Sequence, residues 1–235
     1  MVLNELFKAL SFGPAANLAI FGEGSGMIEE ANYPRILNAV NQTFTALYSR
    51  FRLRQKTLVV RAMEGRLMYP LKPIHSALST NPLSDKFIMD TVDDPFLGDI
   101  LRIELVTDAL GVAYNLNDRT ENCRTVFVPA PDTLQLVKFE DLEEFMVEYR
   151  ASHPKLALDN TDLEQTIDLP YAYQAAFLAH LTGKIYQSLN GPENSAKGVE
   201  FLAEWERLCG EHEFHNTDVA HQSNTNIRPA LNGWP

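Results

Sequence analysis

Apolar residues recur at spacings of three and four near the start of the chain, which is the pattern of an amphipathic helix. The clearest run covers residues 34–51, with Asn32 as a suitable N-cap and Pro34 in the first turn. One stripe along this run should face the core: Leu37, Val40, Phe44, Leu47 and Phe51. An earlier helical rhythm covers residues 3–21 and is interrupted at Gly13-Pro14.

The last third of the chain returns to the helical period. One helix is predicted over residues 170–189 and a second one from there to residue 213. The link Asn190-Gly191-Pro192 suits this, since glycine favours the left-handed C′ position and proline the first turn of a helix. Facing apolar stripes predict an antiparallel hairpin of these helices. Its expected core positions are Phe177 and Leu181, then Val199, Leu202, Trp205, Leu208 and Cys209.

Between the helical segments, apolar residues recur at every second position, which is the pattern of β-strands. Strands are predicted at residues 58–60, 67–69, 100–106, 112–116, 125–128, 133–137 and 145–150. Glu64-Gly65 is the expected hairpin turn between the first two strands, and residues 70–95 are predicted as loop with one short helix. Strands spaced about 10 residues apart are typical of a small antiparallel sandwich or a curled sheet.

These patterns together predict an α+β fold. Its parts are a helical bundle of residues 1–52 and 166–213, an inserted antiparallel β-rich domain of residues 53–165, and an extended C-terminal arm of residues 214–235. The arm has no period, and its apolar residues Ile227, Leu231 and Trp234 stand alone among Asn, Thr and His. Such a segment cannot bury a core of its own, so we expect it to bind a partner.

The composition narrows the class of protein. The 235 residues are 45% hydrophobic and carry a formal net charge of -11, which indicates a folded chain that repels nucleic acid. Cys123 and Cys209 are too few for a disulfide framework. The start of the chain lacks the pattern of a signal peptide, and no stretch has the roughly 18 apolar residues of a membrane span. We therefore expect a soluble protein of a reducing compartment.

Two groups of residues resemble ligand sites but depart from the patterns that such sites need. Gly22-x-Gly24-x-Gly26 follows a helical segment instead of a strand, and its third glycine comes one residue too early for a dinucleotide loop. We interpret it as a linker between helices. Cys209, His212, His215 and His221 are of the types that bind zinc, but Cys209 fits the apolar face of its helix. We predict neither a metal nor a cofactor.

Carboxylates gather in one predicted loop, at Asp85, Asp90, Asp93, Asp94 and Asp99. A pair acting as acid and base needs a fixed separation in a cleft, whereas adjacent carboxylates before a proline favour a solvated turn. The G-x-S-x-G and H-E-x-x-H motifs are missing from the sequence. We therefore predict that the protein is not an enzyme.

One basic stretch has cations at every second position: Arg50, Arg52, Arg54 and Lys56. The favoured interpretation is a helix C-terminus, where cations complement the dipole, passing into an edge strand. The alternative is contact with an acidic partner or with DNA that passes nearby.

Several local sequences, spread over nearly the whole chain, suggest a family. They are RILN at 35–38, LYSRF at 47–51, VEYRASHP at 147–154, IDLP at 167–170, WERLC at 205–209 and the closing Gly233-Trp234. In this order they resemble the head-to-tail adaptor (connector ring) proteins of short-tailed bacteriophages, the podoviruses. Residues 70–95 do not match the family pattern.

The resemblance implies a structural virion protein at the head–tail junction, assembled in the host cytoplasm. Twelve copies would form a ring that binds the portal protein on one side and the tail nozzle protein on the other. The ring would seal the packaged capsid and let DNA pass without specific binding, with no role for a membrane. The arm would bind the portal, with Ile227, Arg228, Leu231 and Trp234 as its contact residues.

Two functions of other classes stay open from the sequence. One is a metal-dependent hydrolase or nuclease that uses the carboxylates of residues 85–99. The other is a non-viral intracellular assembly adaptor with the same predicted fold and a different partner.

Overall fold

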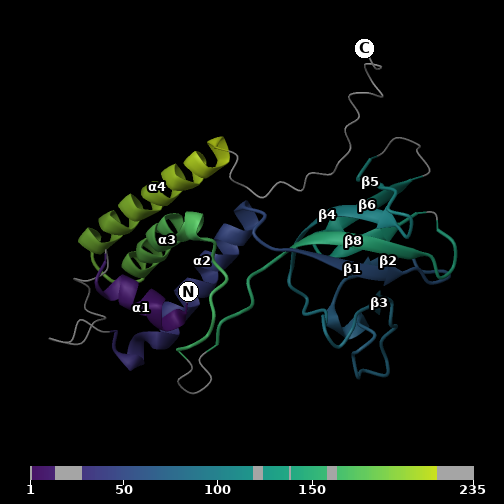
Figure 1. Ribbon diagram of the computed structural model, residues 1–235, viewed down its shortest axis with the longest axis horizontal. Coiled ribbons are helices and arrows are strands. Elements are labelled where there is room, and N and C mark those ends of the chain that lie inside the picture. The colour runs from purple at the N-terminus through teal and green to yellow at the C-terminus, as the bar shows by residue number, and fades with distance from the viewer. Residues whose placement is uncertain (1, 14–27, 119–123, 138, 158–162, 216–235) are drawn as a thin grey trace, which may run out of the picture.

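The computed structural model describes residues 2–13, 28–118, 124–137, 139–157 and 163–215, and these form a mixed α+β fold, as predicted (Figure 1). The helices are α1 (Leu3–Ser11), α2 (Tyr33–Arg50), α3 (Gln174–Gln187) and α4 (Pro192–Phe214). Short 3-10 helices lie at η1 (Glu30–Asn32), η2 (Pro73–His75) and η3 (Tyr171–Tyr173). No helix in these ranges is long and apolar enough to cross a membrane.

The start of α2 follows the sequence signals with one difference. Pro34 lies in the first turn and Asn32 occupies the N-cap position, as expected. The Asn32 side chain makes no capping hydrogen bond, because η1 leads directly into the helix and leaves this residue in a helical conformation. The helix then ends at Arg50, where Phe51 turns into extended backbone.

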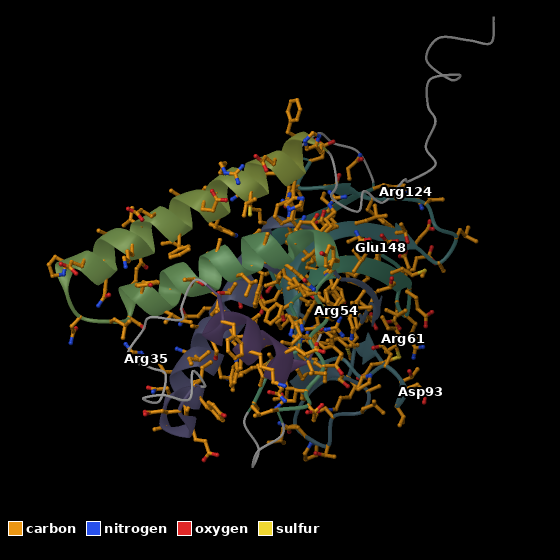
Figure 2. All side chains as sticks on the ribbon, turned by 60° about the vertical axis from the view of Figure 1, so that its left-hand side comes forward. Arg35, Arg54, Arg61, Asp93, Arg124 and Glu148 are labelled. Carbon is orange, nitrogen blue, oxygen red and sulfur yellow. The ribbon has the colours of Figure 1, made fainter. Side chains whose placement is uncertain are left out.

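The connection between α3 and α4 also differs from the prediction. α3 ends at Gln187, so Gly191 is not its C′ residue but the N-cap of α4, with φ 115° and Pro192 in the first turn. Glycine is still required there, because L-residues with a side chain rarely adopt this φ. α4 lies at the outside of the molecule with many of its side chains in solvent (Figure 2). Val199 points outward and is 61% exposed, which corrects its assignment to the core stripe.

The strands form two four-stranded sheets. The first has the order β3 (Ile88–Met89), β1 (Gln55–Arg61), β8 (Glu144–Ala151), β4 (Ile100–Asp108). The second has the order β2 (Met68–Pro70), β7 (Thr133–Leu136), β6 (Thr125–Ala130), β5 (Asn115–Leu116). All pairs are antiparallel except β5 with β6, which is parallel.

The hairpin predicted at Glu64-Gly65 is wrong. β1 and β2 belong to different sheets, because β1 already pairs with β3 and β8 while β2 pairs with β7. The turn is real, with Gly65 at φ 75°, and it carries the chain from one sheet to the other. The Tyr69 hydroxyl holds it by donating to the carbonyl oxygen of Arg66 at 2.9 Å.

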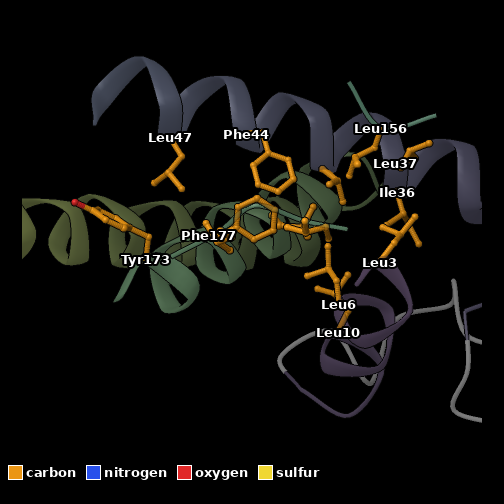
Figure 3. Packing of buried hydrophobic residues seen from close by; sticks show 14 of the residues in the cluster. Leu3, Leu6, Leu10, Ile36, Leu37, Phe44, Leu47, Leu156, Tyr173 and Phe177 are labelled. Atoms are coloured by element: carbon orange, nitrogen blue, oxygen red, sulfur yellow. The ribbon is translucent and has the colours of Figure 1, made fainter. Parts of the chain in front are cut away.

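Two apolar cores are present. One is shared by the four helices and by Leu156, Ile167 and Leu169, and the other lies between the two sheets. Phe44 of α2 and Phe177 of α3 meet at the centre of the first, with ring centroids 4.5 Å apart (Figure 3). The predicted core residues that are buried are Leu37, Val40, Phe44, Leu47, Phe51, Phe177, Leu181 and Cys209. Leu202 and Trp205 are only partly buried, because α4 packs on one side alone.

Candidate functional site

The basic stretch of residues 50–56 runs from the end of α2 into β1, and the structure pairs each of its cations with a carboxylate. Arg50 lies 2.6 Å from Glu206 and 2.7 Å from Glu213, both in α4. Its guanidinium also sits over the Trp205 ring, 5.3 Å from the centroid. The hydrogen bond from Arg50 lowers the pKa of Glu213. Arg50 therefore ties α2 to α4.

The next cation ties the helices to the first sheet. Arg52 lies 3.1 Å from Glu104 in β4, and the same carboxylate is 2.9 Å from Arg150 in β8. Arg150 is buried and donates to the carbonyl oxygen of Ser49 in α2 at 2.6 Å. Glu104 is thus shared by two guanidiniums at the boundary between helices and strands.

Arg54 and Lys56 pair with the loop that precedes β4. Arg54 is 3.8 Å from Asp99, and Lys56 is 3.9 Å from Asp99 and 3.0 Å from Asp94. The Tyr149 hydroxyl donates to Asp99 at 3.1 Å, and burial together with the Asp99 charge raises the pKa of Tyr149. The ion pairs of Arg50, Arg52, Arg54 and Lys56, here called the ion-pair ladder, therefore join the helices, the first sheet and residues 94–99 within one chain.

Among the acidic loop residues, Asp94 and Asp99 share Lys56, whereas Asp85 and Asp90 have other partners. Asp85 pairs with Arg66 at 2.9 Å, and Asp90 accepts hydrogen bonds from the Ser76 hydroxyl and from the amide of Phe96. Burial acts to raise the pKa of Asp90, but these hydrogen bonds outweigh it and leave the pKa below its usual value. Asp93 lies at the outer margin of the molecule, whereas Arg54 lies nearer the interior (Figure 2).

A small cavity lies beside this loop, with a volume of about 170 Å³. Lys56 and Tyr149 line it from the sheet, and Asp94 and Phe96 line it from the loop. It places a cation and a carboxylate against aromatic walls, which suits contact with a polar side chain of a partner better than enclosure of a large ligand.

The residues of zinc-binding types lie in different environments, as Cys209, His212 and His215 show. Cys209 is buried against the helical core, and burial raises its pKa to about 11. His212 packs against Tyr173, with ring centroids 4.7 Å apart, and His215 is exposed at the end of α4. No cluster of three metal-binding side chains occurs within the described ranges. His221, the Gly22–Gly26 linker and the arm residues Ile227, Arg228, Leu231 and Trp234 lie outside those ranges.

Two buried histidines, His153 and His180, were not predicted from the sequence. His153 stacks on Phe44 with ring centroids 4.0 Å apart, and its Nε2 accepts the Asp168 amide at 3.2 Å. His180 lies 2.9 Å from the Thr43 hydroxyl, and burial lowers its pKa to about 4. The burial of His180 could have been predicted from its spacing, because it follows Phe177 by three residues and so lies on the same face of the helix.

Comparison with known proteins adds no assignment: no protein-family model matches the chain, and no curated protein shows significant similarity to it.

Proposed function

We propose that this chain is a structural virion protein, a head-to-tail adaptor that forms a ring between the portal and the tail nozzle of a short-tailed phage. The observation that carries the proposal is the order of its cores along the chain. α1 and α2 from the start share one apolar core with α3 and α4 from the end, while the strands between them share another. This order favours a helical bundle as the hub, residues 1–52 and 166–213, with a β-rich insertion at residues 53–165.

The ion-pair ladder supports a rigid subunit. A ring of identical copies needs the same head-to-tail contact repeated at each step, and this requires a fixed angle between the contacting parts. Arg50 joins α2 to α4, and Glu104 joins α2 and β4 through Arg52 and Arg150. Of these pairs, Arg150–Glu104 is nearly buried on both sides, and a buried pair can favour one geometry even where it adds little net stability.

The distribution of exposed apolar side chains supports an assembly role for the segments that connect the strands. Of the 16 large apolar side chains that are exposed in the described ranges, 12 lie between residues 67 and 146. Leu83 and Leu110 are 95% and 89% exposed. The β-rich part of the chain therefore carries most of the exposed apolar side chains that are available for contacts with other proteins. We assign this part of the subunit to contacts with neighbouring copies and with the nozzle.

The arm completes the proposal and rests on the sequence alone. It follows α4 directly, and its contact residues Ile227, Arg228, Leu231 and Trp234 would order against the portal as they bind. Ring formation, capsid sealing and DNA passage then follow from assembly, without catalysis.

The test is to mix the purified chain with the portal ring of the same phage and to count bound copies by electron microscopy. We expect a stacked ring of twelve copies. Deletion of residues 216–235 should abolish binding, while circular dichroism shows an unchanged fold. Retained binding after this deletion would refute the arm assignment. Failure of the intact chain to bind the portal would refute the adaptor function, and turnover of a phosphodiester with a stoichiometric divalent metal would establish the nuclease instead.

A further inference from the structure

The first sheet has an open edge at the start of β1. β3 pairs only with Val59 and Val60, so residues 55–58 of β1 have no strand on that side in the described ranges. The amide of Arg61 donates to Phe87 on this side, and backbone direction alternates along a strand. The N–H and C=O of Thr57 therefore point to the open side, where the cavity of about 170 Å³ lies.

This edge is acidic at its rim. Asp94 has a side chain that is 66% exposed, and its partner Lys56 is only 15% exposed beneath it. Asp93 is exposed beside it and points away from the sheet (Figure 2). Phe96 lines the cavity, so an arriving guanidinium would meet both carboxylate and aromatic surface.

The opposite edge of the same sheet carries an exposed cation, Arg102. β4 forms this edge and β3 the other, at opposite margins of the sheet (Figure 1). Arg102 in β4 is exposed, and no carboxylate in the described ranges pairs with it. Its register partner Arg150 and the nearby Arg52 already share Glu104. Arg150 is buried in the inner strand β8, so Arg102 is the guanidinium that this edge presents to solvent.

The first half of β4 is also open along its backbone. Residues 112–114 cover only its second half, where Tyr114 donates to Val106 and Asp108 donates to Val112. Residues 100–105 have β8 on one side and no strand on the other in the described ranges. An uncovered strand edge is a template for pairing with another chain.

We propose that the Arg102 edge of one copy docks on the Asp94 cavity edge of a second copy of this chain. The contact joins two different surfaces, so it is heterologous and repeats from copy to copy. Arg102 pairs with Asp94 over the cavity, and the open backbone of β4 faces the Thr57 backbone groups. The proposal deepens the ring of the proposed function and rests on it only for closure of the repeated contact.

Charge reversal tests the contact through Arg102→Glu and Asp94→Arg. Each variant alone carries like charges on its two edges, and we expect its self-association to weaken by about tenfold or more. An equimolar mixture restores opposite charges at every contact, so assembly should return, as it should in the double variant. Lys155→Glu, which reverses an exposed charge elsewhere, is the matched control.

Sedimentation velocity of the free protein and electron microscopy on the portal provide the two readouts. Assembly by either single variant as strong as that of the natural chain would overturn the proposal. So would a mixture that fails to recover, or a natural chain that does not self-associate in either setting. Portal binding by isolated copies would overturn the contact and leave the adaptor function standing. Self-association through this contact without portal binding would overturn the adaptor function and leave the contact standing.

Discussion

Gly183 of α3 and Gly198 of α4 lie directly against each other where the two helices pack. A Cβ atom built on either residue would come within 3.1 Å of the other residue's carbonyl oxygen. The Cβ of residue 198 would also lie 2.8 Å from the Gln187 side chain. The two helices therefore approach at a distance that only glycine allows.

Gly198→Ala should destabilise the protein, because part of the clash is with the backbone of α3 and cannot be relieved by a rotamer change. We expect a loss of about 1–3 kcal/mol in the free energy of unfolding, measured by urea denaturation. Gly210→Ala is the matched control on the same helix, since no atom lies within 4 Å of its Cβ position. This control should stabilise by about 0.5–1 kcal/mol through helix propensity. Equal effects of the two changes would contradict the described packing.

Phe44→Ala tests the centre of the helical core. The ring is 2% exposed and contacts Phe177 and His153, so truncation leaves a cavity among aromatic rings. We expect a loss of roughly 3–5 kcal/mol in unfolding free energy, and a smaller loss for Trp205→Ala because that ring is only partly buried. Leu83→Ala at a 95% exposed position serves as the control and should change little. A loss under about 1 kcal/mol for Phe44→Ala would argue against its place in the core.

The helices could be predicted from the sequence because their evidence is local. The stripe from Leu37 to Phe51 fixes both the helix and its buried face within one segment of chain. Most strands could be located in the same way, although β3 lies in residues 70–95, which were predicted as loop. The partners of the strands could not be predicted. The pairing of β1 with β3 and β8 joins residues far apart in sequence, and the bulges in β4 bury both Ile103 and Val106 against simple alternation.

The candidate site was less predictable than the fold for a related reason. The spacing of Arg50, Arg52, Arg54 and Lys56 marks a basic stretch, but nothing local says which carboxylates pair with it. Glu206 lies in a helix over 150 positions away, and Glu104 lies in an edge strand. Only the tertiary arrangement brings them together.

Stability should fall in acid because of His180. Burial lowers its pKa from 6.5 to about 4 in the folded protein, and Lys184 in the same helix acts in the same direction, while Glu206 opposes it. The unfolded chain therefore takes up the proton first as pH falls. The contribution of His180 is full above pH 6.5 and is lost progressively as pH falls toward 4.

Urea denaturation at a series of pH values measures this loss for His180→Gln and for the natural chain. In this interval the slope due to one group is at most about 1.4 kcal/mol per pH unit. The variant should show a flatter dependence, and part of the slope should remain, because burial also lowers the pKa of His153. His215→Gln, at an exposed position, should leave the profile unchanged. Identical profiles for His180→Gln and the natural chain would contradict this assignment.

Glu104→Gln removes the carboxylate that Arg52 and Arg150 share. Arg150 is buried, and its remaining bond to the Ser49 carbonyl does not neutralise its charge. We expect a loss of about 3–5 kcal/mol in unfolding free energy, because breaking one side of a buried ion pair leaves an uncompensated charge. Salt up to 1 M should not abolish the difference from the natural chain, since buried charges are screened much less than exposed ones.

Arg207→Gln is the matched control for this pair, because Arg207 bonds Glu204 and Glu211 on the exposed face of α4. Its removal should leave stability almost unchanged, as is usual for exposed ion pairs. Comparable losses in the two variants would mean that Glu104 acts as a surface residue. The larger loss for Glu104→Gln would instead show that the buried Arg150 charge depends on this carboxylate.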